Sequence, residues 1–351
     1  MPLVSRVLRP PRYGWADDQG LAVKPSTGQL LSEFAHRLNV FSTRKNWLAL
    51  TSWLQPIALV PFFLIFLLKY FTWPLAVAAF VYSMIGMGSH GTTWYHRFST
   101  HGAYKFSHGF WRFLTQNLVV KAVSEELYVV SHLVHHHKSD RPGDPYLAEN
   151  GFLYCFIADA VHQPIAWDLS ERDYTRTTAW LKRTGIPMNS YAEYQVWGSI
   201  SKPVATWVHW ALNWGFWYGV FWLVGGHALA TALFGGACFW AFGVRTFNWG
   251  GHGGGKDRRV DGEDFSHDDR SINQLWPGFV AGEWHSNHHL FPSSARSGFK
   301  TWQLDLPWFY IRALHALGGV TEFNDAKQTF HEKHYGPWLD ARAAEAVEQA
   351  S

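Results

Sequence analysis

The amino-acid sequence predicts an all-α membrane protein in which four transmembrane helices form two hairpins beneath a helical cytoplasmic cap. Three observations support this fold class. Hydrophobic residues make up 47% of the 351 residues and charged residues only 16%, well below the quarter that is usual in soluble proteins. Four apolar runs are each long enough to cross a hydrocarbon core of about 30 Å. The Lys and Arg residues lie almost entirely outside these runs.

The apolar runs come in two pairs along the chain. Pro56 and Pro61 interrupt the first run, which a membrane helix tolerates when neighbouring groups satisfy the freed carbonyls. Gly225, Gly226 and His227 separate the last two runs and predict a tight reversal between two helices. We therefore expect spans at about 53–71, 74–95, 204–224 and 228–247.

The basic residues orient these spans. Residues 1–52 contain seven Lys or Arg, residues 95–202 contain eleven, and the chain after 249 contains ten. The first hairpin loop has only Lys69 at its edge, and the second has none. The positive-inside rule then places both termini and the long central segment in the cytoplasm. Four core helices of a soluble protein are the alternative interpretation, and the run lengths disfavour it.

These features divide the chain into three parts. Residues 1–46 form a cytoplasmic arm, expected to be loose apart from one short helix near 32–38. Residues 47–323 form the membrane domain, whose cap comprises 96–202 and 248–323, and residues 324–351 form a polar tail. With only Cys155 and Cys238, neither a disulfide framework nor a cysteine-ligated cluster is available. The net charge of +3 carries little information, and no nucleic-acid partner is expected.

The 20 histidines form the strongest functional signal. Spacings of i, i+3 and i+4 put three imidazoles on one helix face, where they can converge on metals. Imidazole suits Fe, Zn and Cu, so the ligand type alone does not select the metal. All the clustered histidines fall at the cytoplasmic side of the predicted topology. The groups are His96 with His101, then His132 with His135 and His136, then Asn248 with His252, and finally His285 with His288 and His289.

The remaining histidines have simpler interpretations, because a lone histidine is usually packed or solvated. We expect His137 to be a neighbour of the ligands and His90 to lie buried in the second span. Metal-bound histidines normally donate their second N–H to a carboxylate or carbonyl. The carboxylates close in sequence are candidates for this role, with helix caps or solvated groups as the alternative: Glu125, Glu126, Asp140, Asp144, Asp268, Asp269 and Glu283.

The order H-x4-H, H-x-x-H-H, N-x-x-x-H, H-x-x-H-H resembles the membrane fatty acyl desaturases, including the stearoyl-CoA desaturase group, over about residues 50–320. The stretch HHHKSDRPGDP, the LFP after the last box, Trp302 and Asp305 extend the similarity. The resemblance implies an acyl tunnel beneath the metals and a metal-bound water on Asn248. It also implies that two irons are bound by nine histidines: His96, His101, His132, His135, His136, His252, His285, His288 and His289.

The chain also departs from the commonest desaturases, at GEWHSNHH, HGAYKF and SEELYVVSH. Two reactions therefore stay open. In the first, O2 and electrons remove hydrogen from a fatty acyl chain to form a double bond. In the second, the same centre converts free fatty acids to terminal 1-alkenes by oxidative decarboxylation, as the resemblance to that branch implies. A hydroxylase and a metal-binding membrane protein rank below both. A metal transporter would place its ligands near the bilayer midplane, unlike these clusters.

Two kinds of partner follow from these hypotheses. The chain encodes no electron carrier, so a separate ferredoxin, cytochrome or reductase should dock on the cytoplasmic cap. The substrate is expected to be a fatty acid or a fatty acyl thioester, with an anionic head. Candidate anchors for that head, which can equally contact anionic lipid heads, are Lys138, Arg141, Arg258, Arg296 and Lys300.

Overall fold

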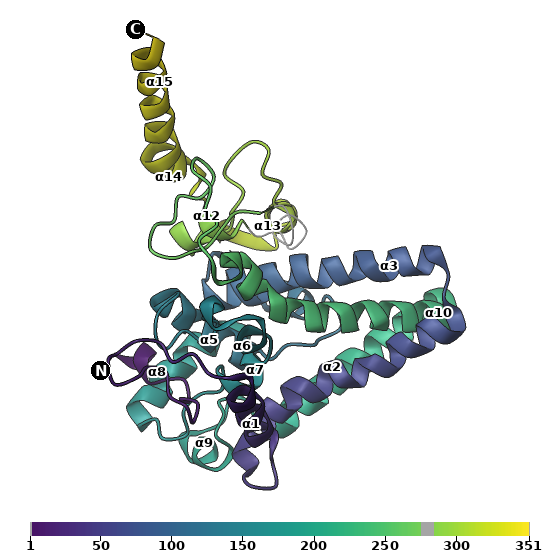
Figure 1. Cartoon of the computed structure of the whole chain (residues 1–351). Helices are drawn as coiled ribbons and strands as arrows, with labels where there is room; N and C mark the ends of the chain where they lie inside the picture. The colour runs from purple at the N-terminus through teal and green to yellow at the C-terminus, as the bar shows by residue number, and fades with distance from the viewer. Residues whose placement is uncertain (1, 275–283, 351) are drawn as a thin grey trace.

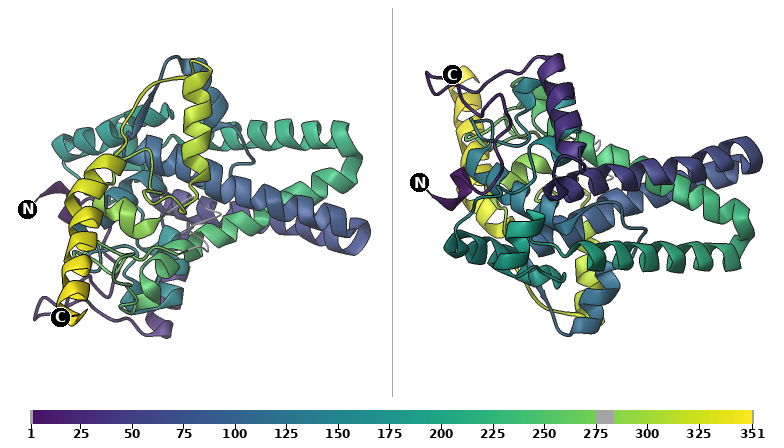
Figure 2. Two further views of the ribbon diagram at one scale, coloured as in Figure 1. Left: turned by 90° about the horizontal axis from the view of Figure 1, so that it is seen from above. Right: turned by 90° about the horizontal axis from the view of Figure 1, so that it is seen from below.

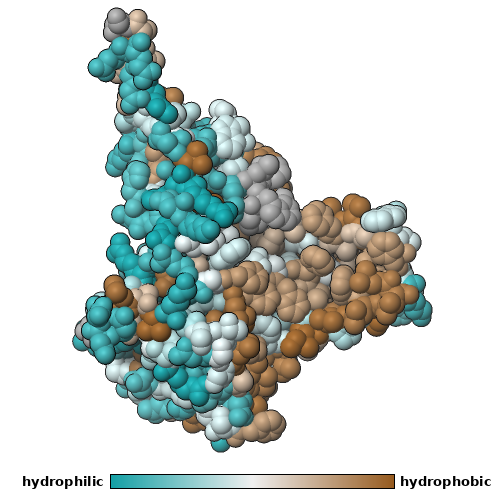
Figure 3. Space-filling view, viewed as in Figure 1, coloured by the Kyte–Doolittle hydropathy of each residue, from teal (hydrophilic) through white to brown (hydrophobic). Residues whose placement is uncertain are grey.

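Long helices protrude from one side of the body of the molecule (Figure 1). The computed structural model describes residues 2–274 and 284–350, and these are mostly helical, as predicted. Figure 3 shows the apolar side chains gathered over the protruding helices, whereas the rest of the visible face is mainly hydrophilic. This separation of apolar and hydrophilic surface is expected when one part of a protein lies in lipid and the other part lies in water.

The first apolar run forms helix α2, Trp47–Ile65, followed by a π-helical turn, Phe66–Tyr70. It begins about six residues earlier than predicted, because a 3-10 turn at Arg44–Asn46 leads directly into it. The helix continues through Pro56 and Pro61. The whole segment therefore runs uninterrupted from the edge of the body to the far tip.

The second run forms helix α3, Trp73–Met84, and continues in a π-helical segment, Ile85–Thr100. The hydroxyl of Thr72 accepts a hydrogen bond from the backbone N–H of Leu75 and caps the start of the helix. The predicted end at about residue 95 is too early. Because the helical backbone continues to Thr100, it carries His96 into the body.

The last two runs form α10, Pro203–Gly251, whose backbone leaves helical geometry at Gly225 and Gly226. Gly226 has a φ of 65°, a left-handed conformation that glycine adopts without steric cost. The chain reverses there, as both views in Figure 2 show. Among the described helices, Arg44–Tyr70 and Pro203–Gly251 are long and apolar enough to cross a membrane.

Small residues allow the protruding helices to approach each other closely. A Cβ on Gly236 of α10 would clash with the backbone carbonyl of Ala79 on α3. A Cβ on Gly86 would meet the indole ring of Trp240. Glycine at such positions lets backbones pack at short range, which is how helices in lipid gain much of their association energy.

The body is built around helix α5, Glu125–Lys138. Its apolar face, which includes Val129, Val130 and Val134, packs in a core with Leu181 and Tyr194. These partners come from α8, Glu171–Leu181, and α9, Tyr191–Trp197. Further short helices complete the body: α4 (Gly109–Gln116), α6 (Phe152–Phe156), α7 (Ala158–Val161), α12 (His285–Leu290) and α13 (Leu306–Ala316).

The N-terminal arm is more ordered than predicted. Its helix α1, Thr27–Leu38, is longer than expected because Ser26 and Gln29 form a reciprocal capping box. Val7 is fully buried and Leu8 nearly so, in the same core as α5. The arm is therefore packed onto the body and is not loose.

Two short strands lie outside the all-helical prediction. Strand β1, Tyr104–Phe106, pairs antiparallel with β2, Val320–Phe323. The predicted polar tail is helical and comprises α14 (Lys327–Phe330), a π-helical turn (His331–Tyr335) and α15 (Gly336–Ala350). Helix α15 projects from the body (Figure 1).

Candidate metal centre

Four chain segments bring nine histidines to the junction between the body and the protruding helices. The end of the second apolar helix supplies His96, and His101 follows it directly. Helix α5 carries one H-x-x-H-H box and α12 carries the other. His252 is the first residue after α10. Three of these segments lie at the C-terminal ends of helices. The fold therefore brings these helix ends together at one place.

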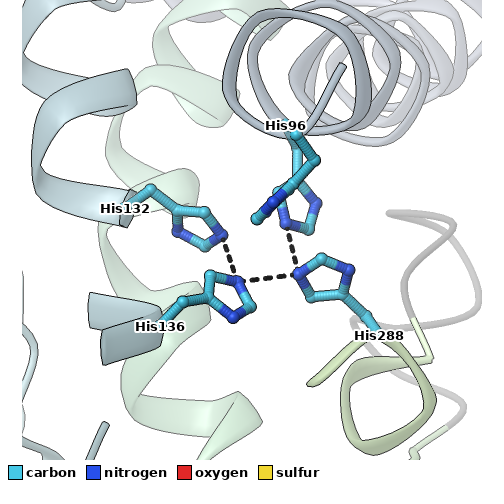
Figure 4. Close-up of side chains that lie close together, drawn as sticks. His96, His132, His136 and His288 are labelled. Carbon is cyan, nitrogen blue, oxygen red and sulfur yellow. Dashed lines mark hydrogen bonds between the residues drawn. The ribbon is translucent and has the colours of Figure 1, made fainter. Parts of the chain in front are cut away.

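Five of the histidines form a group whose ring nitrogens lie within 4.8 Å of one another: His96, His101, His132, His136 and His288. We call this the five-histidine group. The Nε2 atom of His288 lies 2.8 Å from that of His96 and 2.9 Å from that of His136. The Nε2 atoms of His136 and His132 are 3.1 Å apart. Figure 4 shows these four rings pointing toward one another from three segments of the chain.

The other four form a second group within the same limit of 4.8 Å: His135, His252, His285 and His289. We call this the four-histidine group. The Nε2 atom of His252 lies 3.1 Å from the Nε2 atoms of both His135 and His285. The two groups are adjacent, because the rings of His136 and His289 stack with their centroids 4.6 Å apart.

Each H-x-x-H-H box is divided between the two groups in a reciprocal way. On α5 the first and last histidines of the box join the five-histidine group, and the middle one joins the four-histidine group. On α12 the assignment is reversed, so that only His288 joins the five-histidine group. At about 100° per residue, position i+4 lies about 40° to one side of position i and position i+3 about 60° to the other side, so the three side chains spread over one broad helix face. This spread allows one box to contribute to two neighbouring sites.

Three predicted carboxylates hold histidines of the four-histidine group by Nδ1. Asp144 lies 2.9 Å from His135, Asp140 lies 3.2 Å from His252, and Asp269 lies 2.6 Å from His289. A carboxylate on Nδ1 fixes the tautomer in which Nε2 presents its lone pair. All three rings are thereby oriented to offer Nε2 to the middle of the group.

The donor set fits a bound transition metal. The Nε2 atoms of His101 and His289 are buried and have no hydrogen-bond partner among the described residues. A buried polar atom of this kind is costly unless something binds it. Convergent neutral imidazoles suit Fe, Zn or Cu. The histidine clusters are therefore compatible with metal binding.

The pKa values of six of the clustered histidines are lowered, which favours the neutral, metal-binding form. Burial lowers the pKa of His289 to about 4, against the opposing effect of Asp269. Burial would also lower the pKa of His135, but the Asp144 carboxylate outweighs it and raises that pKa. Burial and the neighbouring imidazoles hold the pKa well below its usual value of 6.5 in five other rings: His101, His132, His136, His285 and His288.

Among the other predicted carboxylates that the structure describes, none holds a histidine in this way. Glu125 is bound by Lys121 at 2.5 Å, and Glu126 accepts the backbone N–H groups of residues 200 and 201. Asp268 is exposed, although its neighbour Asp269 is buried. Glu283 lies outside the described residues. Glu125 and Glu126 are both buried, so the alternative of solvated groups does not describe them either.

The two histidines set apart from the clusters lie where predicted. His90 is fully buried in the second apolar helix. His137 is exposed on the outer face of α5, and its Nδ1 donates a hydrogen bond to the carbonyl of Leu133, 2.8 Å away.

A cavity, called here the central cavity, is lined by residues that contact the histidine groups, although none of the nine histidines lines it. Asn248 lines it, one helical turn before His252. Tyr128 and Tyr146 also line it, and the sequence analysis overlooked both. The ring of Tyr128 stacks on His132 with centroids 5.4 Å apart, and that of Tyr146 packs on His135 at 5.3 Å. The i, i+4 spacing of Tyr128 and His132 was an available signal, whereas Tyr146 has no comparable signature.

None of the five basic residues predicted to anchor a substrate head lines the central cavity. Lys300 is buried, with Glu263 3.1 Å from its Nζ. Arg296 lies 3.5 Å from Asp325 and over the ring of Trp308. Arg141 and Arg258 are exposed and Lys138 is half-buried. Their role as anchors stays a prediction.

A mostly helical fold with long apolar helices and two adjacent histidine groups, one of them backed by carboxylates, is compatible with a membrane-associated metalloprotein, and the comparisons identify the family. The family model for fatty acid desaturases matches residues 71–324. The chain is 29% identical to the Delta-9 acyl-lipid desaturase 1 of Arabidopsis thaliana, over 72% of this chain and 76% of that protein. It is 27% identical to the sn-1 stearoyl-lipid 9-desaturase of Anabaena variabilis, over 74% of this chain and 88% of that protein.

The chain belongs to the fatty acid desaturase family. The predicted resemblance is therefore confirmed, and so is the prediction of an oxidoreductase that acts on fatty acyl substrates. A shorter segment of 56 residues is 48% identical to the Delta-9 desaturase-like 5 protein of Arabidopsis thaliana. Local similarity is thus much higher than the average over the chain.

Proposed function

We propose that this protein is a membrane two-iron oxidase that uses O2 and externally supplied electrons to remove hydrogen from a fatty acyl chain and form a double bond. The observation that carries the proposal is the pair of adjacent histidine groups in a member of the desaturase family. The five-histidine group would hold one iron and the four-histidine group the other.

The metal is needed because acid–base side chains cannot break an unactivated C–H bond. A bound iron pair would supply the oxidising power. The protein positions the ligands, and Asp140, Asp144 and Asp269 keep three imidazoles in the metal-binding tautomer. Tyr128 and Tyr146 cover the histidines on the cavity side and limit access of water. Asn248 is proposed to hold a metal-bound water from the same wall.

We further propose that four spans cross the membrane with both termini and the metal centre in the cytoplasm. The reversal at Gly225 and Gly226 supports two crossings by α10. Large apolar side chains on the protruding helices face outward, with Leu68 86% and Leu223 77% exposed. Such exposure is unfavourable in water and ordinary in lipid. The distribution of Lys and Arg supports the orientation.

Two partners complete the proposal. The electrons would come from a separate ferredoxin, cytochrome or reductase that docks on the cytoplasmic body. The substrate would be a fatty acid or a fatty acyl thioester, and its chain would enter the central cavity from the bilayer.

Oxidative decarboxylation to a terminal alkene is the second candidate, and one observation favours it. The guanidinium group of Arg245 lines the central cavity and is paired with Asp159 at 2.6 Å, and a tunnel that binds only hydrocarbon does not require a charged group there.

Gas chromatography with mass spectrometry of lipids and headspace from cells that express the chain tests both reactions. His288→Ala is the inactive variant, and His137→Ala is the matched control because His137 is exposed. New internal double bonds that depend on His288 support the desaturase. Alkenes one carbon shorter than the supplied acid support the decarboxylase. Products that persist in His288→Ala contradict the assignment of the metal centre.

A further inference from the structure

A broad groove, called here the basic groove, opens on the body of the protein and has a volume of about 590 Å³. The start of the N-terminal arm, the end of the second apolar helix, α5 and α8 contribute to its walls. The N-terminus and α8 lie on the side of the body opposite the protruding helices (Figure 1). In the proposed topology the groove therefore faces the cytoplasm, away from lipid headgroups, and it is open to a soluble partner.

The basic groove adjoins the five-histidine group through the backbone. Thr100 lines the groove and directly precedes His101. His137 also lines it and directly follows His136. Both of these neighbours, His101 and His136, belong to the five-histidine group. Two walls of the groove therefore continue along the chain into histidines that would hold a metal.

Two arginines line the basic groove, and none of its described lining residues is acidic. Arg183 is exposed and donates a hydrogen bond to the carbonyl of Thr100 at 3.1 Å, but it forms no ion pair with a carboxylate of the described residues. Arg176 has 54% of its side chain exposed and lies 3.9 Å from Asp173. That carboxylate already binds Arg6 at 2.8 Å. Both guanidinium groups of the groove are therefore available to an anionic partner.

The two arginines belong to a longer basic stripe on α8 and the turn that follows it. Arg172 is exposed and lies four residues before Arg176, which puts both on one helix face. Arg183 follows seven residues later, about two helical turns further on, in the 3-10 turn Lys182–Thr184. Trp180 is half-buried and lines the groove between them. Arg and Trp are the residues that most often dominate protein–protein binding energy, so the stripe suits a protein partner with an acidic surface.

We infer that the basic groove is the docking site of a soluble one-electron carrier protein whose surface around its cofactor is acidic. This inference rests on the proposed function, which requires electrons from outside the chain, and it adds where the carrier binds and which charge it presents. Opposite charges accelerate the encounter of two proteins and orient it. Redox contacts of this kind are small and weak, so the oxidised carrier can leave.

The electron count of the proposed reaction requires such repeated encounters. Each encounter passes one electron from a reduced carrier to the centre, and one double bond takes two encounters. These two electrons, two protons from solvent and two hydrogen atoms of the acyl chain convert one O2 into two waters. The carrier leaves in its oxidised form after each encounter, which a salt-sensitive contact at an open groove permits.

Equilibrium binding to the purified holoenzyme in nanodiscs of zwitterionic lipid measures docking without turnover. The probes are two acidic carriers in their oxidised form, a plant-type ferredoxin and the soluble domain of cytochrome b5, and the basic cytochrome c. Wild type is expected to bind an acidic carrier but not cytochrome c, with an affinity that falls as salt is added. Arg176→Glu combined with Arg183→Glu should weaken this binding at least about ten-fold. Arg312→Glu should bind as wild type does, because Arg312 is an exposed cation on α13, away from α8 (Figure 1).

Conservative variants separate the charge of the groove from a structural role of its arginines. Arg176→Lys combined with Arg183→Lys keeps both charges and should keep most of the affinity, and its thermal midpoint shows whether the body is intact. Two results would overturn the docking site: full affinity in the charge-reversed variant, or a wild type that binds neither acidic carrier at low ionic strength. Tight binding of coenzyme A that the charge-reversed variant loses would assign the groove to a small phosphate anion and would also overturn it.

The proposed function can fail separately from the docking site. His288→Ala removes a proposed metal ligand but leaves the groove unchanged, so this variant should bind the acidic carrier as wild type does. Lipid products that persist in His288→Ala would defeat the proposed function, whereas loss of carrier binding only in the charge-reversed variant supports the basic groove as the docking site.

Discussion

The Nε2 atoms of His96 and His288 lie 2.8 Å apart, although 192 residues separate them in the sequence. His96 belongs to the end of the second apolar helix, and His288 belongs to α12 of the body. The contact joins the membrane-type half of the chain to its hydrophilic half. A metal ion that binds both rings would therefore fasten the two halves together.

Replacement of His288 by Ala is expected to reduce bound iron toward half the wild-type amount, because only the five-histidine group loses a ligand. His288 is the one member of its box in the five-histidine group, and its Nε2 atom contacts two other rings there. Iron per chain, measured by plasma mass spectrometry on purified protein, checks this. His137→Ala should keep the full amount, and undiminished iron in His288→Ala would show that this group is not a metal site.

Asp269→Asn is expected to weaken metal binding about 10- to 100-fold, as for other carboxylates that orient a ligand histidine. The amide keeps the size of the side chain but can no longer fix the tautomer of His289, whose Nδ1 lies 2.6 Å from Asp269. Iron release to a chelator, followed over time, measures the change. The neighbouring Asp268→Asn is the control, because Asp268 is exposed, and equal effects of both variants would argue against the orienting role.

The metal-free protein is expected to lose stability as the pH falls from about 7 to about 5. The unfolded chain takes up protons on histidine near pH 6.5, whereas burial has lowered the folded pKa of His289 to about 4. The pKa values of five other clustered rings are also lowered. The unfolded state therefore binds more protons in this range, and the free energy of unfolding decreases toward acid.

His135 opposes this trend, because its pKa is raised, but it is one ring against six. Thermal unfolding followed by tryptophan fluorescence at several pH values measures the slope. His289→Gln should make the slope shallower, and a midpoint that does not change between about pH 7 and about pH 5 would contradict the expectation.

Gly236→Val is expected to destabilise the protein by about 2 kcal/mol, the middle of the range for overpacking. Any Cβ at this position meets the backbone carbonyl of Ala79, which cannot move without displacing α3. Gly219→Ala in the same helix is the matched control, since no heavy atom lies within 4 Å of its added Cβ. Thermal midpoints in detergent compare the two, and an unchanged midpoint for Gly236→Val would disprove the close packing of α3 and α10.

The sequence predicted those parts of the centre that depend on helical period. His132, His135 and His136 share a helix, so their presence on one broad face follows from spacing alone, whereas their division between two groups is visible only in the structure. Which carboxylate contacts which histidine does not follow from spacing. Asp268 and Asp269 are adjacent and chemically identical, and only the fold decides that Asp269 faces the histidines.

Contacts between residues far apart in the sequence could not be predicted from the sequence either. Strand β1 has three residues and pairs with a segment more than two hundred positions away, and no short periodic signal marks it. Arg245 was overlooked within an apolar run, although a charge in a predicted span is by itself a functional signal. Its partner Asp159 lies 86 positions earlier in a short helix that no pattern predicts.

The reciprocal division of the two H-x-x-H-H boxes has a consequence for how the centre assembles. Neither metal position is complete until both α5 and α12 are in place, because each helix contributes to both. The chain therefore cannot finish one site and leave the other for later. Binding of the two proposed ions would then occur together at the end of folding, after the membrane half and the hydrophilic half have met in the correct alignment.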